Sequence, residues 1–61
     1  MKLFVYNFNG EIYETTVAFD DTYRVKMRAA KATGEPVSRQ VINGDKITNQ
    51  YYADGVWLNE E

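Results

Sequence analysis

The chain has 61 residues, enough for one small domain, and such a domain buries only about 60% of the surface that its unfolded chain exposes. It contains no cysteine and no histidine, which excludes disulfide bonds and the commonest ligands of zinc, haem and iron–sulfur clusters. The net charge is −2 and 15% of the residues are aromatic, so we expect packed rings, or a partner, to stabilise the fold.

The apolar positions are too scattered for a targeting or membrane segment. The opening stretch MKLFVYNF is too short and too polar for the hydrophobic region of a signal peptide. No segment approaches the roughly 20 apolar residues of a membrane span. We therefore expect a soluble, cytoplasmic protein without membrane contact. The sequence carries no metal, phosphate or cofactor motif, so we also expect no cofactor.

The first predicted element is a β-hairpin, in which the pair Asn9-Gly10 joins strands over residues 2–8 and 11–19. Both segments are rich in β-branched and aromatic residues, and Asn-Gly is the strongest short-range signal for a hairpin turn. The number of residues in the loop fixes the register. A shift of one residue moves every side chain to the other face of the sheet, so the loop decides which side chains form the core.

Two registers compete for this hairpin. A two-residue loop places Tyr6 opposite Tyr13 and gives one aromatic core face. The members of that face are Phe4, Tyr6, Phe8, Tyr13 and Val17, to which Phe19 can be added. A three-residue loop with a bulge at Gly10 places Val5 opposite Tyr13 and buries an aliphatic face instead. It leaves Phe4, Tyr6 and Ile12 outward, whereas the first register leaves Leu3, Val5, Ile12 and Ala18.

A single helix is predicted over about residues 22–33, where good helix formers dominate. Asp20, Asp21 or Thr22 is available as the N-cap, and an acidic residue there suits the positive end of the helix dipole. Gly34 is well placed to end the helix as its C-terminal cap. The sequence therefore predicts one helix directly after the hairpin.

The helix and the segment after it complete an α+β domain. Tyr23, Met27 and Ala30 follow the i, i+4, i+7 spacing of a buried stripe on the helix. After the helix, turn signals at residues 43–44 and 53–55 separate three short segments of strand character. We therefore predict one domain over residues 1–61, built from an N-terminal hairpin, one helix and a short β-meander.

The opening segment MKLFVYNFNG and several later positions match one known family. The matching residues are mostly strand hydrophobics and turn glycines: Met1, Phe4, Val5, Gly10, Val17, Asp21, Thr22, Gly34, Pro36, Val41, Ile42, Gly44 and Ile47. With one deletion inside the helix, residues 1–47 resemble the ubiquitin-like, or β-grasp, family. The order of hairpin, helix and strands also resembles that fold.

The resemblance implies a β-grasp fold and the bulged register of the hairpin. It also implies a protein-recognition surface, for which the matching positions are Phe8 and Ile42, with Phe4 as a lesser contact. Asp45 stands where that family has a lysine, and the chain ends in LNEE in place of a glycine pair. We therefore expect no conjugation to other proteins. On the strength of the resemblance, we predict the bulged loop, which exposes Phe4 and Tyr6.

Charge is unevenly distributed along the chain. Residues 22–34 carry four basic residues and no acid, a local charge of +4, whereas the remainder has three basic and nine acidic residues, hence −6. Arg24, Arg28 and Lys31 follow the spacing of one helix face, and we call them the basic ridge. The plain interpretation is a solvated helix face. The functional interpretations are anion binding, either to nucleic-acid phosphates or to an acidic protein.

No catalytic chemistry is indicated by the sequence. The acidic pair Asp20-Asp21 is explained by helix capping, and the Asn-Gly and Asp-Gly turns do not form a phosphate loop. Without histidine or cysteine, the side chains that most often act as bases and nucleophiles are absent. We therefore expect the protein not to be an enzyme.

The leading hypothesis is a small binding module that acts stoichiometrically on another protein. It would be an adaptor or an inhibitor, for example of the phage type that blocks a host nucleic-acid enzyme or toxin. The predicted protein-binding residues are Phe4, Tyr6, Phe8, Ile42 and Trp57. One alternative is a small RNA- or DNA-binding protein that uses the basic ridge and sheet aromatics, although the net acidity opposes it. The other is a structural homodimer held together by the leftover apolar sheet face.

Overall fold

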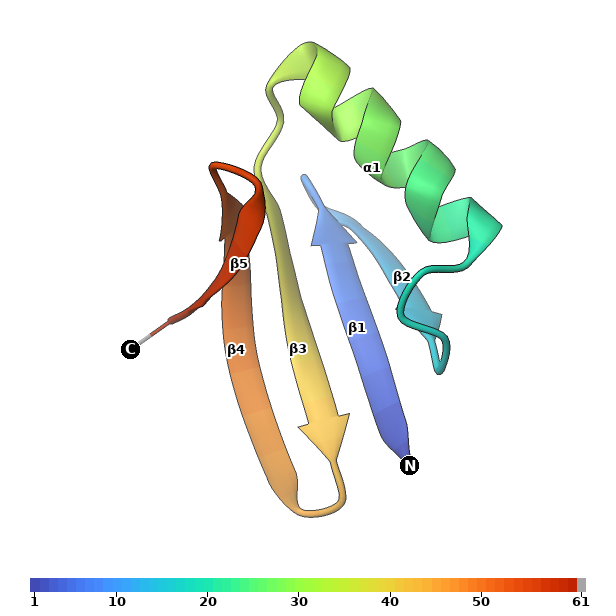
Figure 1. Cartoon of the computed structure of the whole chain (residues 1–61), viewed down its shortest axis with the longest axis vertical. Helices are drawn as coiled ribbons and strands as arrows, with labels where there is room; N and C mark the ends of the chain where they lie inside the picture. Colours follow the sequence, from blue (N-terminus) through green and yellow to red (C-terminus); the bar gives the residue numbers. More distant parts are fainter. Residues whose placement is uncertain (61) are drawn as a thin grey trace.

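Within residues 1–60, which the computed structural model describes, one helix packs on a five-stranded antiparallel sheet (Figure 1). The elements are β1 (Lys2–Phe8), β2 (Glu11–Thr15), α1 (Asp21–Thr33), β3 (Val37–Asn43), β4 (Lys46–Ala53) and β5 (Val56–Asn59). The strands lie in the order β2-β1-β3-β4-β5. The α+β class, the hairpin, the single helix and the meander are therefore confirmed.

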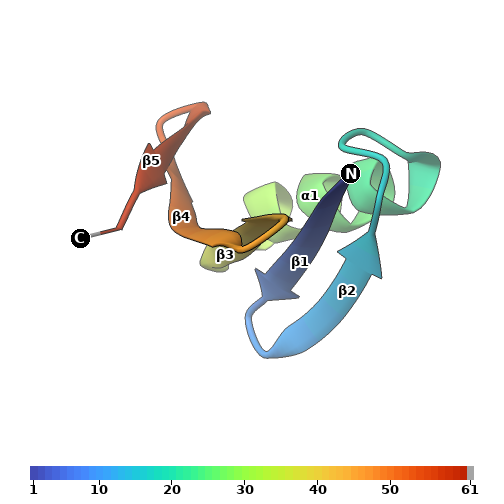
Figure 2. The ribbon, with the colours of Figure 1, turned by 90° about the horizontal axis from the view of Figure 1, so that it is seen from below.

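The helix covers one face of the sheet and leaves the other face open. Figure 2 shows the twisted sheet from below, with α1 on the side of β1 and β2 and with β5 at the far margin. Because side chains alternate along each strand, every second residue points toward the helix and the others point to the open face. At 13 residues, α1 is too short to span a membrane, and no other helix occurs in residues 1–60.

The hairpin has the two-residue loop, so the predicted bulged loop is wrong. Tyr6 lies opposite Tyr13, and Phe8 lies opposite Glu11. Asn9 and Gly10 both adopt positive φ values, 54° and 101°, as a type I′ turn requires. The Asn7 side chain supports the turn, because its Oδ1 accepts a hydrogen bond from the Gly10 amide at 2.6 Å.

The core consists of seven buried side chains: Phe4, Tyr6, Phe8, Tyr23, Met27, Ala30 and Val37. Tyr6 is fully buried, and its ring centroid lies 4.7 Å from that of Tyr23 and 5.9 Å from that of Trp57. Its hydroxyl donates to the Ala18 carbonyl at 3.1 Å, so the one polar atom of this ring has a partner. The predicted buried stripe of the helix, Tyr23, Met27 and Ala30, is confirmed.

The burial of Phe4, Tyr6 and Phe8 corrects the expectation that these rings form an exposed binding surface. Their side chains are 9%, 0% and 7% exposed. The physical reason is the loop length, which turns the aromatic face of β1 toward the helix and removes more apolar area from water than the aliphatic face would. Leu3 and Val5 point to the open face as a result.

Asp20 caps helix α1 and ties it to the second strand. Its Oδ1 accepts from the Tyr23 amide at 2.7 Å, and its Oδ2 accepts from the hydroxyls of Tyr13 at 2.6 Å and Thr15 at 2.9 Å. The hydrogen bond from Tyr13, followed by those from Tyr23 and Thr15, lowers the pKa of Asp20. One carboxylate therefore fixes the start of the helix against the end of β2.

We expect the domain to lose stability in acid as Asp20 is protonated. The folded-state pKa of Asp20 lies below the ordinary aspartate value of 3.8, so the contribution of Asp20 to stability is complete above that value and is lost as the pH falls through the folded pKa. Asp20→Asn keeps a capping oxygen but replaces Oδ2 by an amide nitrogen that cannot accept from Tyr13 and Thr15. It should therefore lower Tm at neutral pH by roughly 5 °C and flatten the acid limb of the Tm profile, measured by circular dichroism. The adjacent exposed variant Asp21→Asn should keep that limb. Identical acid limbs for wild type and Asp20→Asn would contradict the assignment.

Candidate binding groove

A groove of about 470 Å³ lies between helix α1 and the β4–β5 hairpin, which are the green and red elements at the top of Figure 1. We call it the cationic groove. Its lining consists of basic, aromatic and small or flexible residues: Arg24, Arg28, Lys31, Phe19, Tyr23, Tyr52, Trp57, Met27 and Gly55. None of these residues is acidic. The groove therefore combines positive charge with apolar ring surface.

The helix sequence places the basic ridge along the edge of this groove. Arg24, Arg28 and Lys31 each follow one member of the buried stripe by a single residue, which is a rotation of about 100° around the helix axis. The stripe faces the sheet, so the ridge lies along one margin of the helix. That margin faces β5, because all three cations line the groove together with Trp57.

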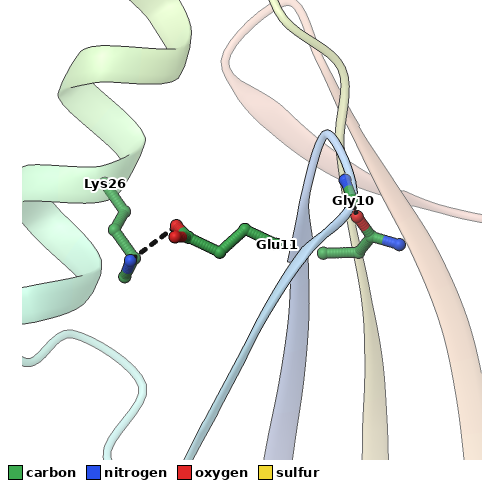
Figure 3. A network of polar contacts seen from close by, with 4 residues as sticks. Gly10, Glu11 and Lys26 are labelled. Atoms are coloured by element: carbon green, nitrogen blue, oxygen red, sulfur yellow. Dashed lines mark hydrogen bonds and ion pairs between the residues drawn. The ribbon is translucent and has the colours of Figure 1, made fainter.

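The other margin of the helix is closed by an ion pair with the hairpin. Lys26 Nζ lies 2.6 Å from Glu11 Oε1, and Figure 3 shows this pair bridging α1 and the start of β2 next to Gly10. Glu11 is partly exposed, so the pair contributes little to stability. The Glu11 carboxylate nevertheless neutralises the positive charge of Lys26. The basic ridge is therefore the side of the helix that keeps most of its positive charge.

Few acids balance the basic ridge. Arg24 Nη1 lies 3.8 Å from an Asp21 carboxylate oxygen, and both side chains are largely exposed. In the described part of the chain, no carboxylate lies within ion-pair distance of Arg28 or Lys31. A hydrogen bond with Tyr52 raises the pKa of Lys31, so this lysine stays charged at neutral pH. The groove is thus positive in a chain whose net charge is −2.

Two of the groove rings already carry cations of the chain itself. The Arg39 guanidinium carbon lies 4.1 Å from the Trp57 ring centroid, and Arg39 Nε donates to Gln50 Oε1 at 2.7 Å. Lys31 Nζ lies 5.0 Å from the Tyr52 centroid. Phe19 remains 63% exposed. The free apolar surface of the groove is therefore concentrated at Phe19, close to the start of the helix.

The predicted site residues separate into three places. Arg24, Arg28, Lys31 and Trp57 meet in the cationic groove, whereas Phe4, Tyr6 and Phe8 lie in the core. Ile42 is half-buried on the open face, opposite Leu3 and Ile47. The sheet thus separates Ile42 from Trp57, and the predicted binding set does not form one surface.

Sequence reasoning missed two residues of the groove, Phe19 and Tyr52. A signal for Phe19 is its place directly before the helix cap, where an apolar side chain often packs back on the first turn; its ring lies edge-on to Tyr23 at 5.8 Å. A signal for Tyr52 is the Asp54-Gly55 turn, because a two-residue loop places Tyr52 opposite Trp57.

Comparison of the chain with models of known protein families, with characterised proteins and with solved structures finds no match. The β-grasp relationship and the ubiquitin-like resemblance therefore stay predictions. Within residues 1–60, no three acidic side chains gather closely enough to hold a metal ion.

Proposed function

We propose that the chain is a non-enzymatic protein-binding module, acting stoichiometrically as an adaptor or inhibitor, and that the cationic groove takes up an acidic segment of the partner. The observation that carries the proposal is the meeting of Arg24, Arg28 and Lys31 with the exposed Phe19 ring around one hollow that no acid lines. This keeps the function expected from the sequence but moves the binding surface from the sheet to the groove.

The spacing of the basic ridge fits a short run of acids. Residues 24 and 31 are seven positions apart on the helix, which corresponds to about 10 Å, or about three residues of extended chain. Two or three carboxylates within four residues of a partner segment can therefore meet the ridge. Arg24 and Arg28 can each bind a carboxylate with two parallel hydrogen bonds, which supports an acidic partner over a merely polar one.

The apolar part of the groove supplies an anchor beside these charges. Phe19 is exposed and lies edge-on to the buried Tyr23, so its position is held by the core while its outer face stays accessible. An aromatic or aliphatic side chain of the partner would lose contact with water there, which is the kind of contact that dominates binding energy in protein interfaces. The acidic remainder of the molecule repels the same segment elsewhere and thereby orients it.

The proposal predicts both the composition of the ligand and the residues that hold it. Peptides selected on the immobilised chain from a random display library should carry at least two Asp or Glu next to a large apolar residue. The double variant Arg28→Glu/Lys31→Glu should weaken binding of the best selected peptide about 30-fold or more, because two attractive contacts become repulsive. Isothermal titration calorimetry measures this change.

A matched double variant separates the groove from net charge. Lys2→Glu/Lys46→Glu alters the total charge equally on exposed strand ends that do not line the groove, and we expect its affinity to stay within about threefold of wild type. Selected peptides without enrichment in acids, or an equal loss of binding in both double variants, would overturn the proposal.

Single-stranded nucleic acid is the second candidate ligand, because cations beside aromatic rings also form nucleic-acid grooves. Two features weigh against it. Arg39 and Lys31 occupy faces of Trp57 and Tyr52, which leaves Phe19 as the accessible stacking surface, and the net charge of −2 repels phosphates. Binding of a thymidine 15-mer that is tighter than that of the selected peptides at physiological salt would favour this candidate over the acidic protein segment.

A further inference from the structure

The open face of the sheet is apolar and carries almost no charge. Among the strand residues that the register places there, Glu14 alone is charged, although 26% of the whole chain is charged. The large apolar residues of this face are Leu3, Val5, Ile12, Ile42, Ile47, Tyr51, Val56 and Leu58. Five of them are well exposed: Ile12 and Ile47 at 56%, Val56 at 52%, and Tyr51 and Leu58 at 40%.

These side chains lie in two rows on either side of a polar row. The first row is aliphatic, and the second contains Asn7 and Ser38 as well as apolar residues. Leu3, Ile42 and Ile47 lie directly opposite one another across β1, β3 and β4, and form the aliphatic row. Gln40 and Asn49 pair in the next row, where Gln40 Nε2 donates to Asn49 Oδ1 at 3.1 Å. In the row beyond, Tyr51 lies opposite Leu58, and Ile12 lies opposite Asn7 at the other margin.

We propose that a second copy of this chain covers the open face and forms a two-fold symmetric dimer. A two-fold axis that lies between the two sheets and runs along the Gln40–Asn49 row places Ile47 of each copy over Tyr51 of the other. Each contact then occurs twice, as an isologous interface requires.

The polar groups of the open face make it complementary to itself. Asn and Gln amides and the Ser38 hydroxyl both donate and accept hydrogen bonds, so the amide row of one copy can bond to the same row of another. Within residues 1–60, the side-chain atoms Gln40 Oε1 and Asn49 Nδ2 take no part in this hydrogen bond and have no side-chain partner of their own. The strand residues of the face include no base and one acid, Glu14 on the edge strand β2, and Glu60 lines the hollow beside Gln40 and Asn49. The interface would therefore hold few charged groups.

The size of the face also suits a dimer. The two longest dimensions of the molecule are 34 and 26 Å, and Figure 1 shows the sheet spread across them. The projected area of the molecule in this view is of the same order as the roughly 800 Å² per partner of a standard interface. The core on the helix side has only seven buried residues, so a second covered face would add substantially to the buried apolar area.

The dimer interface and the cationic groove lie on opposite faces of the sheet, so this proposal does not depend on the proposed function. Both grooves of a dimer stay accessible. A partner with two acidic segments, or two tethered partners, would then bind with the added strength of bivalency.

Sedimentation equilibrium between about 1 µM and 1 mM tests the assembly. We expect the mass to rise from 7.1 kDa toward twice that value, with a dissociation constant of about 1–100 µM. Ile47→Lys and Tyr51→Lys should each weaken the dimer by about tenfold or more, because each places two charges in the apolar interface. Both residues are exposed in one copy, so the variants should fold, which circular dichroism checks.

Val25→Lys is the matched control, because Val25 is 64% exposed on the helix and lies away from the open face. It should dimerise like wild type. In wild type, amide NMR shifts of Gln40 and Asn49 should depend on concentration, whereas those of Arg28 in the groove should not. A strict monomer at 1 mM, or a dimer that survives both lysine variants on the open face, would overturn the proposal.

Discussion

Replacing Tyr6 by alanine is expected to unfold most of the protein at room temperature. Tyr6 is the one fully buried large side chain in residues 1–60, and its ring stacks with Phe4 and Phe8 and packs on Tyr23 and Trp57. Truncation of a buried aromatic costs about 3–5 kcal/mol. A domain of this length has a total stability of about 3–9 kcal/mol, so the loss approaches the whole. Urea denaturation followed by circular dichroism measures it.

Two companion variants make the Tyr6 result specific. Tyr6→Phe keeps the ring and removes two hydrogen bonds of the hydroxyl, one donated to the Ala18 carbonyl and a longer one accepted from Arg39 Nη1, so it should cost about 1–2 kcal/mol. Val5→Ala should cost less than about 1.5 kcal/mol, because Val5 points to the open face. A larger loss for Val5→Ala than for Tyr6→Ala would mean that the bulged register, with its aliphatic core, is the correct one.

Replacing Trp57 by alanine is expected to damage the fold and the groove together. The indole packs against Tyr6 and Tyr52 and lies under the Arg39 guanidinium. Its removal should cost about 2–4 kcal/mol through lost packing and the lost cation–π contact, whereas Trp57→Phe should cost less than about 1.5 kcal/mol. Urea denaturation followed by circular dichroism compares the two, since neither variant retains tryptophan fluorescence.

Phe19→Ala separates binding from stability in the same region. Phe19 is 63% exposed, so its truncation should change the stability by less than about 1 kcal/mol while weakening binding of a selected acidic peptide about tenfold. Unchanged peptide binding by Phe19→Ala would contradict the role of Phe19 as the anchor.

For Trp57, equal stabilities of Trp57→Ala and Trp57→Phe would contradict the structural role of the indole.

The positions of the elements could be predicted from the sequence because their signals are local. The helix was expected over about 22–33 and spans 21–33, since capping residues and helix formers act within a few residues of one another. The hairpin register could not be settled in the same way. Asn9-Gly10 fits either loop length, and the choice depends on packing of Phe4, Tyr6 and Phe8 against a helix that begins more than ten residues later.

For a similar reason, the sequence predicts the helix side of the candidate site but not the strand side. Arg24, Arg28 and Lys31 share a helix face, which spacing alone reveals. What lies opposite that face depends on the order of the strands, and β4 and β5 reach the helix only because β3 pairs with β1. The sequence therefore predicts Trp57 as a binding residue but not the helix residues that lie beside it, and it does not indicate Tyr52.

The order of the strands also bears on how quickly the domain can fold. Two-residue turns connect β1 to β2, β3 to β4 and β4 to β5, so these pairs can form with little loss of chain entropy. The pairing of β1 with β3 is different, because Phe8 lies opposite Val37 and the loop between them contains β2 and α1. Closing that one long loop is the main entropic barrier that the topology imposes. Asp20 joins the helix to β2 within that loop, so if this contact forms first, the loop that remains to be closed is shorter.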